Sequence, residues 1–347
     1  MKLGNLEISN NLLLAPLQNI TTSPFRRFCR RYFKVGLVFI PMIYTKRITR
    51  NVDSIEQELL KISEEKPISI QLMGRDLEDF KRTLGLLESY DIDGIDINAG
   101  CSSRRALNSK SGAYLIIDLK HLKKILNLAV KHSSFPVSLK TRIGESKPNN
   151  LQKITETIND SDIDFLTVHA RTIDSKFDRE ELNLEALKTI KKLSKIPVIG
   201  NGDIKNPIFA KKVLDYTKVD GLMIGRESMG NPEIFSQISN YLAQNEYISF
   251  KNNLDLWFER LKLYEDCIDE YLDGLQNLIS AEEYKFSELK RNSIWLTKGL
   301  KNSTIIRRKL SQTKKLENLK STFQEIMNSK IIYAPKINSK EIIQRFY

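Results

Sequence analysis

The sequence predicts a parallel β/α barrel followed by an all-helical domain, and two observations support this fold class. Eight short apolar runs recur in the first 225 residues, with helix-like stretches between them. Almost every run ends in, or leads to, a residue whose side chain can do chemistry. Alternation of strands and helices favours parallel βαβ units, and eight such units close into a barrel whose active site lies at the carboxyl ends of the strands.

The eight apolar runs are the expected strands. In chain order they are LLLAP (12–16), GLVFI (36–40), ISIQL (68–72), GIDIN (94–98), VSLK (137–140), DFLTVH (164–169), PVIG (197–200) and DGLMIG (220–225). Apolar spacing of three and four predicts helices over 77–90, 119–132, 151–159, 184–193 and 207–216. An open doubly wound sheet is the alternative. It is disfavoured because no G-x-G-x-x-G follows the first strand and no Walker-type motif is present.

The strand pattern stops after about Phe235, and the remaining sequence is predicted to be helical. The expected helices cover Asp255–Leu275, Ala281–Lys298 and Ile305–Leu319, with Leu316–Ser329 as a continuation or a separate helix. We therefore expect two domains: a catalytic barrel over residues 1–244 and a basic helical domain over residues 245–347.

Composition excludes several classes of protein. No apolar run approaches the ~18 residues that cross a bilayer, and no signal-peptide pattern opens the sequence. We expect a cytoplasmic protein without membrane association. Three scattered cysteines, Cys29, Cys101 and Cys267, are not the pattern of a disulfide framework, and no C-x-x-C metal spacing occurs.

The positive charge of the chain is concentrated at its end. Residues 285–347 carry fifteen lysines and arginines but only four acidic residues, so nearly all of the net charge of +12 lies there. A near-neutral body with a strongly basic end indicates a polyanion partner, most simply nucleic acid. A solvated, lysine-rich helical surface is the alternative.

Two turns after the last two expected strands are candidates for a phosphate site. Asn201, Gly202 and Asp203 follow the seventh run, and Gly225 and Arg226 follow the eighth. Glycine lets backbone N–H groups approach an anion, and arginine can hold it with two parallel hydrogen bonds. Each turn alone could be an ordinary strand-to-helix connection; the pair on neighbouring strands favours a phosphate-bearing ligand.

Three other strand residues could bind a cofactor ring. Lys140 would supply a fixed positive charge, Gln71 could hydrogen-bond an amide-like ring edge, and His169 ends the sixth run. A rim lysine that reaches solvent and a structural histidine are the alternatives.

Cys101 follows the fourth run and leads into a polar loop with Arg104, Arg105 and Lys110 nearby in sequence. A thiolate here could be a nucleophile, because cations lower a thiol's pKa. A thiol could instead be a general acid. A small buried hydrophobe is the third interpretation.

These residues together resemble the tRNA-dihydrouridine synthases, flavin enzymes that reduce the C5–C6 double bond of specific uridines in tRNA. The similar stretches cover essentially the whole chain in order and spacing. They are LLLAPLQNITTSPFRRFCR (12–30), ISIQLMG (68–74), DGIDINAGC (93–101), SLKTRIG (138–144), LTVHART (166–172), VIGNGDI (198–204), GLMIGRESMGNPEIF (221–235) and, more weakly, KRNSIWLTKGLKNSTIIR (290–307).

The resemblance implies roles for matching residues. Cys101 would donate a proton to the uracil ring, and Asn98 and Arg171 would face the target base. Lys140 and His169 would stabilise charge on the flavin and the base. NADPH or NADH would be the reductant, and tRNA the substrate. FMN would be held by Pro16, Gln71, Lys140, His169, Asn201, Gly202, Asp203, Gly225 and Arg226.

The basic helical end would then hold tRNA phosphates, which position the RNA without selecting the base. The candidates for this contact are Lys298, Lys301, Arg307, Arg308 and Lys309. No obligate protein partner is expected.

The sequence departs from the family's pattern mainly on the substrate side. Ser102 replaces the usual proline after the cysteine, SKSGAYLI (109–116) thins a glycine-rich stretch, Ile40-Pro41 replaces a threonine–glutamate pair, and Leu17 replaces a methionine. We expect a divergent target uridine, with lost activity as the alternative. Two other functions compete: an FMN barrel enzyme acting on a free pyrimidine, and a flavin-bound tRNA-binding protein without reductase activity.

Overall fold

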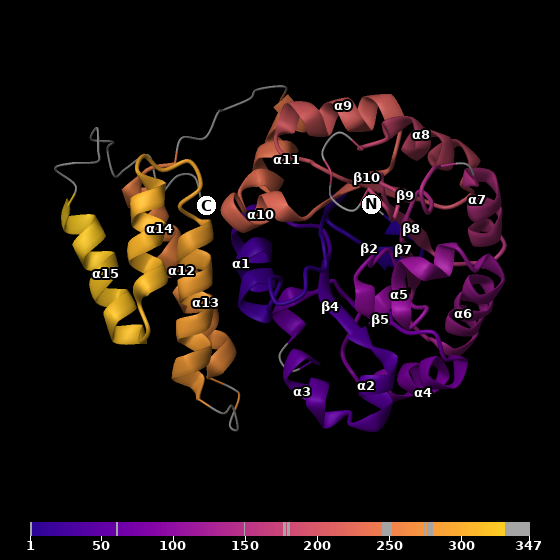
Figure 1. Cartoon of the computed structure of the whole chain (residues 1–347), viewed down its shortest axis with the longest axis horizontal. Coiled ribbons are helices and arrows are strands. Elements are labelled where there is room, and N and C mark those ends of the chain that lie inside the picture. The colour runs from indigo at the N-terminus through magenta and orange to yellow at the C-terminus, as the bar shows by residue number, and fades with distance from the viewer. Residues whose placement is uncertain are drawn as a thin grey trace.

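In the computed structural model of the chain, eight parallel strands form one barrel, which confirms the predicted fold class (Figure 1). The structure describes residues 2–59, 62–148, 150–175, 178, 181–244, 252–273, 275 and 280–329. The strands lie in the order β3-β10-β9-β8-β7-β6-β5-β4. A parallel bridge between Leu13 and Leu37 joins the two ends of this sheet, and Leu14 N donates to Leu37 O at 3.0 Å. The sheet is therefore closed.

All eight expected strands are present, most within two residues of the expected bounds. They are β3 (Leu12–Leu14), β4 (Val38–Tyr44), β5 (Ile68–Met73), β6 (Gly94–Ala99), β7 (Val137–Arg142), β8 (Phe165–His169), β9 (Val198–Asn201) and β10 (Gly221–Ile224).

β4 differs most from expectation, because it continues four residues beyond Ile40. Its pairing with β5 shifts register between Ile40 and Ile43, and Pro41 lies in this irregularity. Proline has no N–H to donate, so a bulge is one of the few positions where a strand tolerates it. The bulge leaves Met42 on the wall of the cavity described below.

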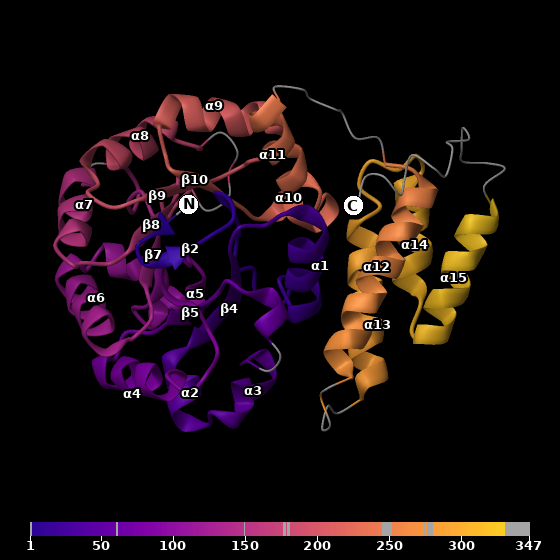
Figure 2. The ribbon, with the colours of Figure 1, turned by 180° about the vertical axis from the view of Figure 1, so that it is seen from behind.

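The helices surround the barrel as the apolar spacing predicts (Figures 1 and 2). Asp76, Asp118 and Asn183 cap three of them by accepting a backbone N–H three residues later. The longer helices are α1 (Ser23–Phe33), α4 (Leu77–Leu87), α6 (Leu119–His132), α7 (Leu151–Asn159), α8 (Leu184–Leu193), α9 (Pro207–Thr217) and α11 (Ile234–Gln244). Shorter ones are α2 (Thr45–Arg50), α3 (Asp53–Leu59), α5 (Arg104–Asn108), α10 (Arg226–Gly230), η1 (Ile62–Glu65) and η2 (Gly112–Ile116).

A two-stranded hairpin, β1 (Lys2–Leu3) and β2 (Leu6–Glu7), covers the amino end of the barrel and was not predicted. Gly4 in its turn has φ +61°, and a Cβ there would overlap Asp164, the residue before β8. The apolar side chains of the hairpin join a core inside the barrel. That core consists of Leu3, Leu6, Ile8, Leu13, Ala15, Leu37, Phe39, Phe165, Ile199 and Met223.

The barrel interior is apolar on one side and polar on the other. Successive strand residues point to opposite faces. In β5, Ile68, Ile70 and Leu72 accordingly join the core beneath the helices, while Gln71 points inward. The inward residues of β6 and β7 are also polar, and Gln71 hydrogen-bonds Asp96, which hydrogen-bonds Ser138. The polar side of the interior is thus a connected hydrogen-bond network.

Among the described residues, four helices follow the barrel: α12 (Leu254–Leu272), α13 (Ala281–Trp295), α14 (Ser303–Gln312) and α15 (Leu316–Asn328). α14 and α15 are separate helices, which decides between the two expectations for residues 316–329. The domain boundary expected at residue 245 falls outside the described residues. No helix in the described part of the chain is long and apolar enough to span a membrane.

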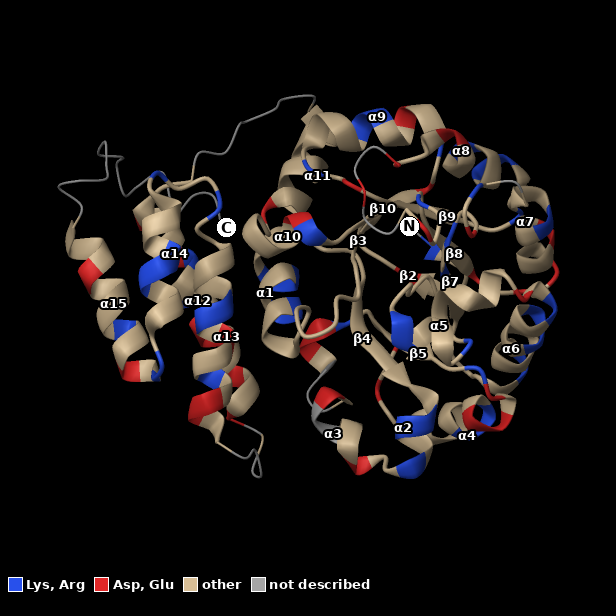
Figure 3. Ribbon diagram, viewed as in Figure 1, with Lys and Arg blue, Asp and Glu red and all other residues tan. Residues whose placement is uncertain are grey.

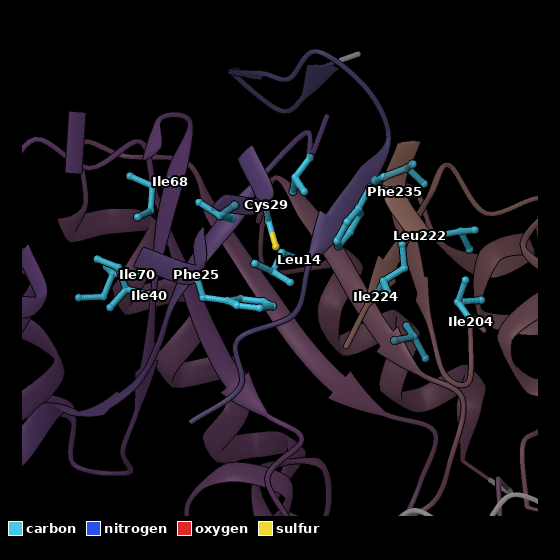
Figure 4. Packing of buried hydrophobic residues seen from close by; sticks show 14 of the residues in the cluster. Leu14, Phe25, Cys29, Ile40, Ile68, Ile70, Ile204, Leu222, Ile224 and Phe235 are labelled. Carbon is cyan, nitrogen blue, oxygen red and sulfur yellow. The ribbon is translucent and has the colours of Figure 1, made fainter. Parts of the chain in front are cut away.

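The terminal helices pack on the barrel through α1. Phe25 and Phe28 of α1 contact Tyr264 of α12 edge-on, with ring centroids 6.4 and 5.4 Å apart. Phe25 and Cys29 also pack toward Leu14 and its neighbours in the barrel (Figure 4). α1 therefore lies between two packed layers and joins the helical end to the strands.

A buried carboxylate, Glu288 of α13, connects the two parts of the chain. Its Oε2 accepts from Thr22 Oγ1 of the barrel at 3.0 Å and from Tyr264 Oη at 2.5 Å, and Arg291 donates to Oε1. A buried charge is tolerated only when paired and hydrogen-bonded. Arg291 and Tyr264 belong to the helical end, and Thr22 is the partner that the barrel adds when α13 docks against it.

We expect Glu288→Ala to lower the free energy of unfolding by about 3 kcal/mol, because it leaves Arg291 and two hydroxyls without their acceptor. Glu282→Ala, in the exposed first turn of the same helix, should cost less than about 1 kcal/mol. Urea unfolding followed by circular dichroism would measure both. Equal effects of the two substitutions would contradict this role for Glu288.

Candidate active site

A cavity of about 640 Å³ opens at the carboxyl ends of the strands, and residues next to α5 and within α10 line part of it. Every residue expected to bind the cofactor lines this cavity, and so do Asn98, Cys101 and Lys298. These residues come from segments up to about 280 positions apart, and barrel closure brings them together. The expected cofactor-binding residues on the cavity wall are Pro16, Gln71, Lys140, His169, Asn201, Gly202, Asp203, Gly225 and Arg226.

Gln71 and Asn98 form one hydrogen-bonded pair on the cavity wall. Asn98 Nδ2 donates to Gln71 Oε1 at 2.8 Å. Asn98 Oδ1 accepts from the backbone N–H groups of Gly100 at 3.1 Å and Cys101 at 2.9 Å. Asn98 therefore holds the start of the loop that carries Cys101, in addition to lining the cavity.

Cys101 is partly buried and faces the cavity, whereas Cys29 and Cys267 are fully buried. Its Sγ donates to Ser103 Oγ at 3.4 Å, and its carbonyl accepts from Ala113 N at 3.0 Å. Gly112 has φ +58°, and a Cβ there would lie 2.8 Å from that carbonyl. The loop is thus restrained at several points, although Ser102 stands where the family has proline.

Lys140 of β7 provides a cationic group on the polar wall. Its Nζ donates to Asn201 Oδ1 at 3.3 Å, and Asn201 Nδ2 donates to Met223 O at 2.8 Å. Burial lowers the pKa of the Lys140 ammonium to about 8, while the Asp96 carboxylate acts in the opposite direction. Lys140 is therefore mostly charged at neutral pH.

His169 is a neutral imidazole in this site. Burial first, and then the charges of Lys140 and Arg142, lower its pKa to about 2. Arg171 Nη1 lies 3.3 Å from His169 Nε2, and a guanidinium can only donate. The proton of the ring is therefore on Nδ1. His169 can therefore stabilise developing charge by donating a hydrogen bond, but not by carrying a positive charge.

Arg171 occupies a different place from the one expected. Its side chain is fully buried, and it lies behind the cavity wall instead of facing a base. Its guanidinium donates to His169, to Asp203 Oδ2 at 2.6 Å and to the carbonyl of Asp178 at 2.5 Å. The motif LTVHART thus pairs a cavity residue with the arginine that orients it.

Asp203 and Arg226 connect the two turns that were expected to bind phosphate. Arg226 Nη2 donates to Asp203 Oδ1 at 2.5 Å, so Asp203 bridges Arg226 and Arg171. Gly202 has φ +137°, and a Cβ there would lie 2.5 Å from Leu182 Cδ1. Glycine at this position lets the turn bring Asn201 and Asp203 to the same cavity.

Arg142, two residues after Lys140 on β7, also lines the cavity and was missed. Its Nε donates to Gly100 O at 2.8 Å and its Nη1 to Thr172 O at 2.7 Å. Burial lowers its pKa to about 10, which leaves it charged at neutral pH. The two-residue period of the strand could have identified it, because Lys140 and Arg142 share a face.

The basic residues expected to contact tRNA differ in whether they already have a partner within the protein. Lys298 lines the cavity and pairs with Glu227 at 2.6 Å. Arg307 donates to Thr297 Oγ1 at 2.7 Å, and Lys309 pairs with Glu325. Lys301 and Arg308 are exposed, and neither has an ion-pair partner within the described part of the chain. Figure 3 shows lysine and arginine on α14, which carries Arg307–Lys309.

Comparison with known proteins identifies the family. A model of the dihydrouridine synthase (Dus) family matches residues 13–331. The chain belongs to the dihydrouridine synthase family. tRNA-dihydrouridine synthase B of Pasteurella multocida is 33% identical over 249 residues, which cover 72% of this chain and 74% of the relative. A probable tRNA-dihydrouridine synthase of Rickettsia bellii is 31% identical over 312 residues, covering 88% and 91%.

Solved structures similar to this dihydrouridine synthase family member share its barrel. Morphinone reductase superposes with a TM-score of 0.54 at 12% identity, covering 69% of this chain and 88% of that protein. 2-Naphthoyl-CoA reductase gives 0.52 at 12% identity, covering 69% and 51%. At this identity the similarity shows the fold alone.

Within the described residues, no cluster of three or more His, Cys, Asp or Glu side chains could hold a metal ion.

We expect the imidazole of His169 to stay uncharged between about pH 5 and pH 8, because burial and four neighbouring cations oppose its protonation. An NMR titration of histidine signals would test this, with His169→Gln used to assign the resonance. A midpoint near the ordinary histidine value of about 6.5 would contradict the proposed environment.

Proposed function

We propose that this protein is a tRNA-dihydrouridine synthase that reduces the C5–C6 double bond of uridines in tRNA. We further propose FMN as its bound cofactor, NADPH or NADH as the reductant and the cytoplasm as its location. One observation carries the proposal above the others. The candidate flavin residues and the thiol of Cys101 line a single cavity, in a chain whose family is established.

The residues of the cavity fit FMN. A cavity of about 640 Å³ is within the usual range for cofactor sites. Gln71, Lys140 and His169 offer hydrogen-bond donors suited to the polar edge of a flavin ring. Arg226 and Lys205 supply cations for a phosphate, and Gly225 lies beside Arg226 on the cavity wall. When bound, FMN supplies hydride chemistry that no side chain can supply.

The chain's own residues provide the proton and the electrostatics. The Sγ–H of Cys101 would protonate C5 of a uracil ring that enters the cavity, leaving a thiolate. The Lys140 charge, held by Asn201, would stabilise negative charge that develops in the cavity. A uridine must leave the RNA stack to reach this depth, at a cost of a few kcal/mol. Asn98 lies between Gln71 and the Cys101 loop, where it can contact that base.

The helical end favours a nucleic-acid substrate over a free pyrimidine. Lys298 reaches the cavity from beyond α13, so the helical end forms part of its wall. Lys301 and Arg308 extend exposed positive charge from there. A small-molecule enzyme has no use for this surface, whereas RNA phosphates require one.

The alternative of a flavin-bound protein that holds tRNA without reducing it rests on Ser102. The observed hydrogen bonds of the loop weaken that reasoning, because Asn98 and Ala113 hold Cys101 from both sides. Proline at position 102 is one way to restrain the loop, and these bonds are another.

We expect Cys101→Ala to retain bound FMN and to lose at least about 100-fold of dihydrouridine formation, the usual effect of removing a general acid. Mass spectrometry of tRNA after incubation with NADPH would measure product, and the visible spectrum would report flavin. Ser103→Ala serves as the matched control in the same loop, with a smaller expected loss. Undiminished product from Cys101→Ala would remove the thiol from the acid role.

We also expect tRNA affinity to fall steeply with salt, because binding releases counterions from RNA phosphates. Filter binding over a range of ionic strengths gives the slope of log affinity against log salt. Lys301→Ala and Arg308→Ala should each reduce this slope by about one unit. Lys320→Ala, whose ammonium already pairs with Glu265 at 2.7 Å, should change it less. A flat response in the unaltered protein would exclude a basic docking surface.

A further inference from the structure

A carboxylate that does not line the cavity lies beneath it. Asp96, on β6, is fully buried inside the barrel. Its Oδ1 accepts from Ser138 Oγ at 2.7 Å, and its Oδ2 accepts from Gln71 Nε2 at 2.7 Å. Burial raises the pKa of Asp96 to about 6, against the effect of both hydrogen bonds. Both oxygens accept hydrogen bonds, yet burial still opposes the charge, so the carboxylate is held there at a cost in stability.

The hydrogen bonds of Asp96 continue without interruption to Cys101. Gln71 Nε2 donates to Asp96, Asn98 Nδ2 donates to Gln71 Oε1, and Cys101 N donates to Asn98 Oδ1. Three consecutive bonds of 2.7, 2.8 and 2.9 Å therefore link the buried carboxylate to the backbone of the thiol loop.

The direction of this chain is fixed at both ends. An amide side chain can turn over and exchange its oxygen and nitrogen, so neither Gln71 nor Asn98 sets its own orientation. The backbone N–H groups of Gly100 and Cys101 can only donate, which requires Asn98 Oδ1 to face them. A carboxylate can only accept, which requires Gln71 Nε2 to face Asp96. Both requirements agree with a single arrangement.

We propose that Asp96 is a positioning residue for Cys101, acting through Gln71 and Asn98. By fixing the Gln71 amide it directs Gln71 Oε1 toward Asn98, and Asn98 Oδ1 then holds the loop that carries the thiol. Without an acceptor at position 96, Gln71 can turn over and present its amide nitrogen to that of Asn98, which breaks the chain. This inference rests on the proposed function for the assignment of Cys101 as the acid.

Three variants separate hydrogen-bond direction from simple packing. Asp96→Leu keeps the branched shape of the side chain, although it is larger, and removes both acceptors. Asp96→Asn keeps one: its Oδ1 can accept from Gln71, and its Nδ2 can donate to Ser138, whose hydroxyl also lies 3.3 Å from Ile95 O. Thr167→Val is the control, because Thr167 Oγ1 is buried in the same barrel without a hydrogen-bond partner among the described residues.

The first measurement is the rate at which iodoacetamide alkylates Cys101 in the flavin-loaded protein without tRNA. Only this cysteine is accessible, since Cys29 and Cys267 are fully buried. We expect Asp96→Leu to accelerate alkylation about fivefold, because the loop that carries Cys101 is then less restrained. A fivefold change corresponds to the loss of one hydrogen bond. Asp96→Asn and Thr167→Val should stay within about twofold. An unchanged rate in Asp96→Leu, or an equal change in Asp96→Asn, would overturn the proposal.

The second measurement separates the two half-reactions. Asp96→Leu should slow oxidation of the reduced enzyme by tRNA at least about tenfold, as misplacement of a reacting group does. Because Gln71 also lines the proposed flavin site, flavin reduction by NADPH should slow as well, but by less than about threefold, and half-saturation by tRNA should be unchanged. Equal slowing of the two half-reactions would contradict the proposal.

A double variant tests whether Asp96 acts through the thiol. Asp96→Leu combined with Cys101→Ala should be no slower than Cys101→Ala alone, because effects that pass through one group do not add. Additive losses would overturn the proposal. If Cys101→Ala keeps full activity, the proposed acid role fails, while the alkylation rates still decide whether Asp96 positions the loop.

Discussion

Closure of the eight-stranded sheet is the constraint on which the site depends. The contact between Leu13 and Leu37 joins the first strand of the barrel to the second. It thereby places the turns after β9 and β10 across the cavity from the Cys101 loop. Without closure, Arg226 and Cys101 would lie at distant points of an open sheet. The closed barrel also excludes water from its interior, which strengthens every charge interaction there.

The polarity of the barrel interior follows from the alternation of residues along each strand. One side is filled by Leu13, Phe39 and Met223 and is sealed at the amino end by the hairpin. The other side carries a polar network that rises from Asp96 to the cavity. The apolar side stabilises the barrel, and the polar side orients the groups that face a ligand. Neither side could be exchanged for the other without losing the site.

The sequence predicts most of the fold, because apolar runs and helical spacing are local signals. It also predicts most of the cavity, because residues at strand ends must converge in a barrel. The exceptions depend on contacts between distant segments or on elements too short to show a pattern in the sequence. Because proline is unusual within a strand, Pro41 predicts that β4 ends near Ile40. The strand continues because a bulge formed against β5 accommodates the proline. The hairpin before Ile8 is too short to give a periodic signal.

Functional residues were missed or misplaced where their partners are distant in sequence. Asp96 lies within an expected strand, but its role depends on contacts with Gln71 and Ser138. Arg171 lies next to a strand end, yet Asp203 and His169 hold it behind the wall. Charge counting also overestimated the free basic surface, since Lys285 and Arg291 are neutralised within the helical end.

Binding of FMN by the purified full-length chain is the most direct test of the account. Titration with FMN, followed by flavin fluorescence and visible absorbance, should show saturable one-to-one binding that Arg226→Ala weakens at least about tenfold, as loss of a charged phosphate contact does. A protein that is isolated colourless and leaves the fluorescence of added FMN unchanged would contradict the assignment of this cavity.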